Sequence, residues 1–203
     1  MILNDKQITE RAKAGMIAPF IRTQVRYRVA PGASRQSNAR AIKTLSCGLS
    51  SFGYDVTLAK DVKVFTNASG GEIDPKNMDD DLMVKAKIHK NEEDGEYIII
   101  PPNSYALGHT IEVFDIPRDV LVICLGKSTY ARAGAIINVT PIEPGFKGQV
   151  VIEIANTTTL PLRVYVKEGI AQFLFLQGEP CEVSYGDRNG KYQGQRGITH
   201  SKV

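Results

Sequence analysis

The 203-residue sequence has no tryptophan and only three cysteines and three histidines. Cys47, Cys124 and Cys181 lie far apart and form no CxxC pair, so the sequence predicts neither a disulfide framework nor a structural zinc cluster. We therefore expect a reduced, cytoplasmic protein. No apolar run approaches the ~20 residues that cross a bilayer, and the polar N-terminal residues do not resemble a signal peptide.

The sequence also lacks the motifs of familiar hydrolytic sites. Zinc-dependent nucleoside deaminases carry a His-x-Glu and a Pro-Cys-x-x-Cys. None of the histidines, which are His89, His109 and His200, begins the first motif, and no second cysteine follows Cys181 at the required spacing. No nucleophile elbow is present, although residue order leaves a Ser-His-Asp arrangement open. Hydrolysis by this chain would depend on a carboxylate, an ordered water molecule and hydrogen-bond donors.

Charge is nearly balanced overall but uneven along the chain. The formal net charge of +3 does not indicate a nucleic-acid partner. Residues 22–43 contain five arginines, one lysine and no acidic residue, whereas 79–81 are all aspartate. Two interpretations stay open: both stretches are solvated loops, or the basic one lies near a polyanionic ligand or an RNA-like partner.

The pattern of apolar residues predicts a mostly β domain after one short helix. Asn4 is a helix N-cap with Gln7 three residues on, and Gly15 ends a helix over 4–14. Residues 22–43 are predicted as an extended loop or flap. Short β-branched runs between turn residues then predict the strands of a barrel or sandwich. These runs are 54–59, 97–100, 105–107, 120–125, 136–139, 149–154, 162–166 and 171–176.

No composition shift marks a domain boundary, and no internal repeat is present. We expect a single domain, with residues 1–45 as the helix and basic loop and 46–184 as the β core. Residues 185–203 are polar and glycine-rich, which predicts a mobile C-terminal tail.

The segment GKSTYAR, residues 126–132, carries side chains suited to phosphate. It resembles the end of a P-loop, but Leu121 stands where that motif requires its first glycine, and a β-rich run follows. The segment still combines two cations and two hydroxyls, from Lys127, Arg132, Ser128 and Thr129. A phosphate-binding loop and a polar turn between strands both stay open.

Glu153 lies within an apolar run of strand character. Alternation places it on the opposite face from Ile152 and Ile154. Such a glutamate is either an exposed surface residue, which is the commoner case, or a functional carboxylate. A glutamate that takes a proton from water works best with a raised pKa, which desolvation by apolar neighbours favours and a nearby Arg132 opposes.

Seven separate segments resemble, in the same order, the dCTP deaminases of the deaminase and dUTPase superfamily. They are SSFGYDV (50–56), IPPNS (100–104), GKSTYAR (126–132), VTPIEP (139–144), IEIANTT (152–158), EGIAQ (168–172) and GKYQGQRG (190–197). The resemblance runs over residues 46–197, and the shared order of several motifs makes it specific.

The resemblance implies a distorted, dUTPase-like β-barrel that assembles as a homotrimer with active sites between subunits. It implies hydrolysis of dCTP to dUTP and ammonia on the route to dTTP precursors, with Mg²⁺ on the triphosphate and no zinc. It also implies dTTP as a feedback inhibitor, and neither a nucleic acid nor a membrane as a partner.

The resemblance further implies roles for individual residues. Glu153 is implied as general base and acid, with Ser128 and Arg132 contributed by a neighbouring subunit. Val151 and Ile152 are implied to contact base and sugar through their backbone. The other implied nucleotide-binding residues are Lys127, Thr129, Tyr130 and Ala131, together with Gln172, Tyr185, Lys191 and Gln195, which hold the triphosphate as the tail closes.

Several alternatives stay open. In dUTP diphosphatases the base is an aspartate near the position of Glu143, so the chain could be a dUTPase or convert dCTP to dUMP; the presence of Glu153 favours deamination. A catalytically silent nucleotide-binding protein would have the same fold. A cytosine modified at C5 is another candidate substrate, because Phe146 and Ile142 are near the site in sequence.

Overall fold

The computed structural model describes residues 1–29, 41–66, 71–91 and 93–202. Helix α1 (Asp5–Lys13) has the predicted N-cap, because the Asn4 side chain accepts from the backbone N–H of Gln7 and the Gln7 side chain accepts from the N–H of Asn4. Gly15 follows with a φ of +102°, a backbone conformation that glycine adopts without strain. The short N-terminal helix is confirmed.

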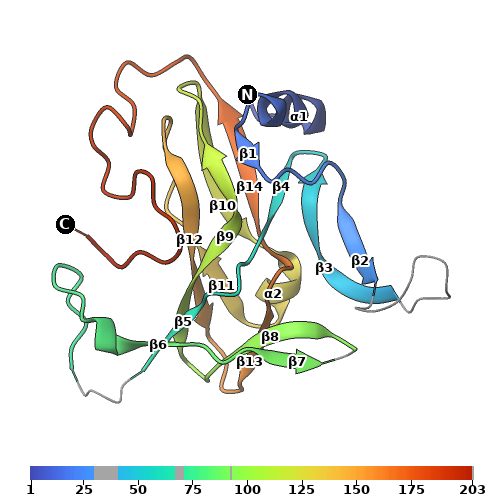
Figure 1. The fold of residues 1–203 in the computed structure, drawn as a ribbon, viewed down its shortest axis with the longest axis vertical. Coiled ribbons are helices and arrows are strands. Elements are labelled where there is room, and N and C mark those ends of the chain that lie inside the picture. The colour runs from blue at the N-terminus through green and yellow to red at the C-terminus, as the bar shows by residue number, and fades with distance from the viewer. Residues whose placement is uncertain (30–40, 67–70, 92, 203) are drawn as a thin grey trace.

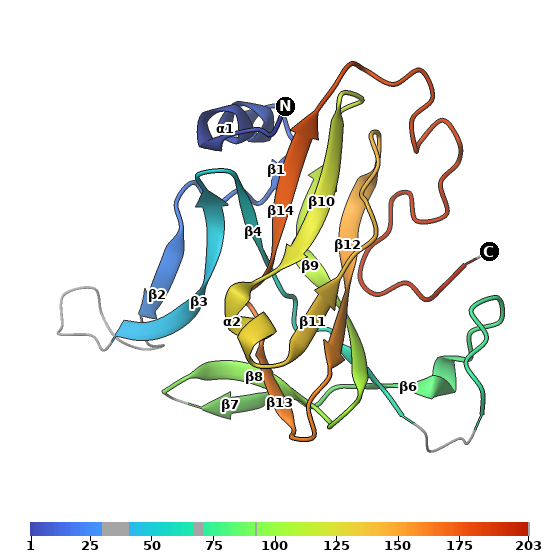
Figure 2. The ribbon, with the colours of Figure 1, turned by 180° about the vertical axis from the view of Figure 1, so that it is seen from behind.

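The strands form three sheets (Figures 1 and 2). The first sheet has the order β11 (Ala135–Asn138), β12 (Lys147–Asn156), β9 (Tyr105–Asp115), β5 (Lys63–Phe65) and β6 (Met83–Lys85), with β1 (Ile17–Ala18) also paired to β9. Its centre is the long antiparallel pair β9–β12, which has a bulge between Gln149 and Val151.

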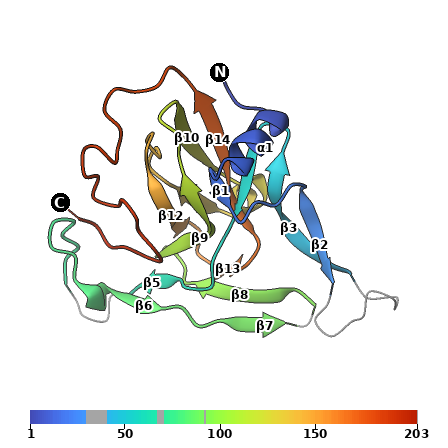
Figure 3. The same ribbon diagram turned by 45° about the horizontal axis from the view of Figure 1, so that its top comes forward.

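The second sheet has the order β10 (Val120–Gly126), β14 (Gly169–Gln177), β4 (Gly53–Thr57), β3 (Ala41–Ser50) and β2 (Val25–Val29). The third is β13 (Leu162–Tyr165), β8 (Gly95–Ile100) and β7 (His89–Asn91), at one end of the molecule (Figures 1 and 3). Strands therefore occur at all eight predicted runs. Two short helices complete the described elements, α2 (Ser128–Arg132) and the 3₁₀ turn η1 (Asp80–Leu82).

The prediction of a loop over residues 22–43 is wrong where the structure describes it. Strand β2 and the start of β3 pair antiparallel and extend the second sheet away from the body of the molecule (Figure 1). The physical reason is residue type: Val25, Tyr27 and Val29 are β-branched or aromatic, and such residues favour a strand. The middle of this stretch, residues 30–40, lies outside the described residues.

Burial alternates along β12 and fixes which residues reach the site. Val150, Ile152 and Ile154 point into the core with almost no exposed surface, so Val151 and Glu153 face the other way. The mostly β prediction is confirmed, but the three described sheets do not close into a barrel. None of the described helices is long and apolar enough to cross a membrane.

Candidate functional site

A cavity of about 820 Å³ opens on the outward face of β12. Its walls come from β9 and β12, the turn at 139–146, the C-terminal tail and the segment 73–78. The tail and the segment 73–78 meet at the mouth, where the Ser201 hydroxyl donates to the Pro75 carbonyl at 2.8 Å. Five predicted site residues line this cavity together: Val151, Glu153, Tyr185, Lys191 and Gln195. Its size is that of a small-molecule site.

Glu153 is half-buried in the middle of β12, directly opposite Asn138 of β11 and Leu107 of β9. The Asn138 amide donates to its Oε2 at 2.6 Å. Burial raises the pKa of the Glu153 carboxyl above its ordinary value, and the Asn138 hydrogen bond lowers it in part. Burial and the charge of Glu153 together raise the pKa of Tyr105 to about 12. A carboxylate with a raised pKa is a good proton acceptor near neutral pH.

The C-terminal tail, predicted to be mobile, runs beside β12 (Figures 1 and 2). Its residues between 185 and 201 form one side of the cavity. Gln195 anchors it: its carbonyl accepts from the Gln149 N–H at 3.0 Å, and its side-chain amide donates to the Gln149 carbonyl at 2.7 Å. The Tyr185 ring packs against Phe146 with centroids 5.9 Å apart. These contacts hold Tyr185 and Gln195 against the cavity.

One edge of β12 has a gap in its backbone pairing, between the part paired with β11 and the part bonded to the C-terminal tail. Strand β11 pairs with β12 from Glu153 onward, and the tail reaches Gln149. In the described part of the chain, no strand pairs with residues 150–152 on that edge. Val151 lines the cavity there, whereas the Ile152 side chain is buried in the core. Any contact from Ile152 to a ligand must therefore use its backbone, which is the kind of contact that the family resemblance implies.

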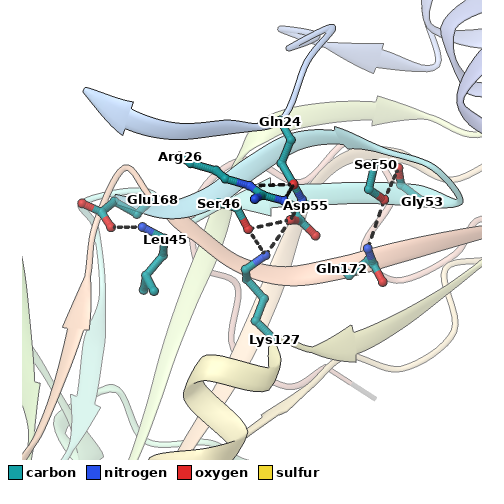
Figure 4. A network of polar contacts seen from close by, with 10 residues as sticks. All are labelled: Gln24, Arg26, Leu45, Ser46, Ser50, Gly53, Asp55, Lys127, Glu168 and Gln172. Carbon is teal, nitrogen blue, oxygen red and sulfur yellow. Dashed lines mark hydrogen bonds and ion pairs between the residues drawn. The ribbon is translucent and has the colours of Figure 1, made fainter. Parts of the chain in front are cut away.

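Lys127 lies elsewhere, in a network between the start of α2 and the second sheet (Figure 4). Its Nζ lies 2.6 Å from Oδ2 of Asp55 and donates to the Ser46 hydroxyl at 2.9 Å. The side chains of Lys127 and Asp55 are only 11% and 3% exposed. Gln24 and Ser46 also donate to the same carboxylate oxygen. The charge of Lys127 is thus neutralised within its own chain.

In segment 126–132, Gly126 ends strand β10 and residues 128–132 form helix α2. Ser128, Thr129, Ala131 and Arg132 are exposed on it. Within the described residues, neither Ser128 nor Arg132 makes a side-chain hydrogen bond or ion pair, and no residue of 127–132 lines the cavity. Tyr130 is instead a core residue, whose hydroxyl accepts from the Tyr165 N–H at 2.9 Å.

Gln172 lies on β14, close to the Lys127 network and apart from the cavity lining. Its side-chain amide donates to the Ser50 hydroxyl at 3.1 Å (Figure 4). The predicted site residues therefore fall into two groups. We call them the Glu153 region (Val151, Ile152, Glu153, Tyr185, Lys191 and Gln195) and the α2 region (residues 127–132 with Gln172).

Sequence reasoning gave no role to Asn138, Asp55 or Arg188, which contact predicted site residues. Asp55 pairs with Lys127, and Arg188 forms an ion pair with Glu143 at the cavity wall. Only Asp55 lay in a motif that signalled the site, within SSFGYDV. The other two carried no local signal, because their partners are distant in sequence.

Among the described residues, no three His, Cys, Asp or Glu side chains come together to hold a metal ion. The charged side chains at the cavity wall include the cations Arg188 and Lys191, which suit phosphate oxygens. A divalent cation that arrives on a triphosphate requires no protein cluster, so these residues fit a metal bound through the nucleotide.

Comparison with known proteins identifies the family. The dCTP deaminase-like family model matches residues 2–178. Proteins named dCTP deaminase from Campylobacter hominis and Azotobacter vinelandii are 51% and 52% identical, covering 98% and 100% of this chain and 95% and 99% of the relatives. One from Pseudomonas putida (strain KT2440) is 53% identical, covering 98% of this chain and 97% of its own.

A solved structure supports the fold alone. The crystal structure of 2'-deoxycytidine 5'-triphosphate deaminase from Agrobacterium tumefaciens has a TM-score of 0.54 and 15% sequence identity, covering 87% of this chain and 48% of that chain. This chain thus spans about half the length of that protein. The family match and the relatives above half identity extend over most of the sequence, and the chain therefore belongs to the dCTP deaminase-like family.

Proposed function

We propose that this protein is a dCTP deaminase that hydrolyses dCTP to dUTP and ammonia, without zinc, in pyrimidine deoxynucleotide metabolism. The observation that carries the proposal is the half-buried carboxylate of Glu153 in the cavity wall of a chain that is about half identical to proteins named dCTP deaminase. Neither family membership nor a lone strand glutamate would specify the chemistry by itself.

In the proposed mechanism Glu153 moves protons between water and the base. Water attacks C4 of cytosine while Glu153 takes one of its protons and delivers it to the ring N3. The second proton of the water then passes to the amino group, ammonia leaves, and the C4 carbonyl of uracil remains. Burial that raises the pKa of Glu153 supports both halves of this role, because the group must accept and return a proton near neutral pH.

The proposal brings the two regions together across a subunit boundary. Ser128 and Arg132 are exposed on α2, where Arg132 would stabilise developing charge and Ser128 would orient the water in a neighbour's cavity. A homotrimer is supported by exposed apolar residues on neighbouring strands, namely Ile123 and Leu125 of β10 and Ile136 of β11. Burying such side chains in an interface is favourable.

For the nucleotide, we propose that the uncovered edge of β12 at residues 151 and 152 contacts the base and sugar. Tyr185, Lys191 and Gln195 would hold the phosphates from the tail, and Gln172 would join them from the α2 region. When bound through the triphosphate, Mg²⁺ would offset phosphate charge. dTTP has the same deoxyribose and triphosphate, so it would compete for this cavity as an inhibitor.

A bifunctional enzyme that carries dCTP to dUMP is the second candidate, because Glu143 also lines the cavity. The Arg188 guanidinium engages this carboxylate, but both side chains are about half exposed, and such pairs are weak. The ion pair therefore leaves Glu143 available as a candidate residue for the second activity. Release of pyrophosphate from dCTP decides between the two activities.

The test is product analysis with dCTP, dUTP, dCMP and 5-methyl-dCTP for wild-type protein and Glu153→Gln. We expect dUTP and ammonia from dCTP, and a loss of about 10²–10⁴-fold in kcat for the variant, the contribution typical of general acid–base catalysis. Binding of dCTP, measured by calorimetry, should change little because glutamine has the same shape. Full activity in Glu153→Gln would falsify the mechanism, and nucleotide binding without any turnover by the wild type would indicate a silent binding protein.

A further inference from the structure

We propose that Asn138 is a positioning residue that holds one carboxylate oxygen of Glu153 and leaves the other oxygen to move protons. The inference rests on the proposed role of Glu153 and adds a residue that no sequence motif assigned.

The geometry follows from strand register. Asn138 and Glu153 are direct partners in the antiparallel pair β11–β12, so their side chains project from the same face of the sheet. The Asn138 Nδ2 donates to Glu153 Oε2 at 2.6 Å. Within the described residues, Oε1 has no hydrogen-bond partner. One oxygen is therefore fixed and the other is available to a bound water.

The position of Asn138 argues against a purely structural role. It is the last residue of β11 and is exposed, and the next residue, Val139, already lines the cavity. Because Asn138 is exposed, it does not need Glu153 to satisfy a buried donor. The hydrogen bond mainly orients the Glu153 carboxylate, which must lie within hydrogen-bond distance of the attacking water.

The chemistry of an amide suits this position. A lysine or arginine donor would also fix Oε2, but its charge would strongly favour the ionised carboxylate and weaken it as a base. A neutral amide orients the group with a smaller penalty. When Oε1 takes the proton, Oε2 becomes the carbonyl oxygen of the acid and still accepts from Nδ2. Asn138 thereby determines which oxygen carries the proton.

The experiment compares pH profiles of kcat for wild type, Asn138→Leu and Asn138→Gln. Leucine has a similar size and no donor, so the pKa of Glu153 should rise, and the acid limb of the profile should move up by about one pH unit. We expect kcat at pH 7 to fall about tenfold with KM for dCTP within about threefold, the signature of a lost transition-state interaction. Glutamine keeps the donor and should restore the limb toward its wild-type position.

Asn91→Leu is the matched control. Asn91 makes the same kind of bond, donating from Nδ2 to Oδ2 of Asp94 at 3.0 Å, on β7 in the third sheet. This control should keep the wild-type profile. An unchanged acid limb and unchanged kcat in Asn138→Leu would overturn the inference, as would a shift equal to that of Asn91→Leu. The proposed function is judged separately, because it depends on Glu153→Gln and on the products from dCTP.

Discussion

The Glu153 region and the α2 region each contain a partly or fully buried charge, but the two charges are held in opposite ways. Glu153 faces a cavity with a neutral amide on one oxygen, and its pKa is raised by burial. Lys127 is sealed against Asp55, with Ser46 as a further acceptor, and is remote from the cavity lining. Glu153 is thus open to a ligand in the cavity, whereas Lys127 is enclosed by its ion pair.

This difference changes how segment 126–132, which resembles the end of a P-loop, is interpreted. A lysine already paired with a buried aspartate is a weaker phosphate ligand in this arrangement, because Asp55 already balances its positive charge. We infer that Lys127 fixes the start of α2, and that Ser128 and Arg132 are the side chains that α2 presents. The predictions below test this division of roles, from the largest expected effect to the smallest.

The largest expected effect tests whether Arg132 of one subunit completes the Glu153 site of a neighbouring subunit. Arg132→Ala should lower kcat/KM for dCTP by about 10³-fold, as expected when a donor to developing charge is removed. Coexpression of Arg132→Ala with Glu153→Gln should return activity to about a quarter of wild type, because one site in four then receives both intact residues. Ammonia release from the purified mixture is the measurement.

The control for this test is coexpression of Arg132→Ala with an Arg132→Ala, Glu153→Gln double variant. That mixture has no site with an intact Arg132 and should stay inactive. Equal activity in the two mixtures would show that α2 does not complete a neighbour's site.

Asp55→Ala should destabilise the protein by about 3 kcal/mol, because Lys127 is left as a buried, uncompensated charge. Denaturant unfolding measures the loss. The additional change Lys127→Met should recover part of it, since the orphaned charge is then gone. Asp61→Ala is the matched control: its partner Lys85 is 3.7 Å away and both side chains are well exposed, so about 0–1 kcal/mol is expected. Similar losses at Asp55 and Asp61 would contradict a buried, stabilising pair.

Gly190→Ala should open the tail without unfolding the β core. A Cβ at Gly190 would lie 2.1 Å from the Tyr185 ring, so one of the two must shift. Overpacking of this kind costs about 1–3 kcal/mol, which predicts a rise in KM for dCTP of about tenfold with little change in thermal stability. Gly178→Ala, where a Cβ meets nothing within 4 Å, should leave KM unchanged. A wild-type KM in Gly190→Ala would separate the tail from nucleotide binding.

Sequence patterns predicted the strands well because each is a short apolar run between turn residues. The same reasoning predicted the outward face of Glu153, which the burial of Ile152 and Ile154 confirms. It failed at Val25–Val29, where alternating arginines were interpreted as a loop although alternation is itself a strand signal.

The side-chain contacts around the candidate site could not be predicted from local sequence patterns. Asn138 contacts Glu153 only because of the register of β11 on β12. Asp55 of β4 contacts Lys127 at the start of α2, which is far from it in the chain. No periodic pattern in the sequence predicts either of these two contacts. The inventory of side chains was predictable, but their partners depend on the three-dimensional arrangement.

The uncovered edge of β12 between the tail and β11 has a consequence for evolution. Substitutions replace side chains and leave peptide groups in place, so a ligand bound by main-chain groups of residues 151 and 152 meets the same pattern in almost every variant. Proline is the one residue that deletes a donor there. Base recognition at this edge would tolerate sequence drift, whereas the proposed function of Glu153 depends on its side chain and would be lost on substitution.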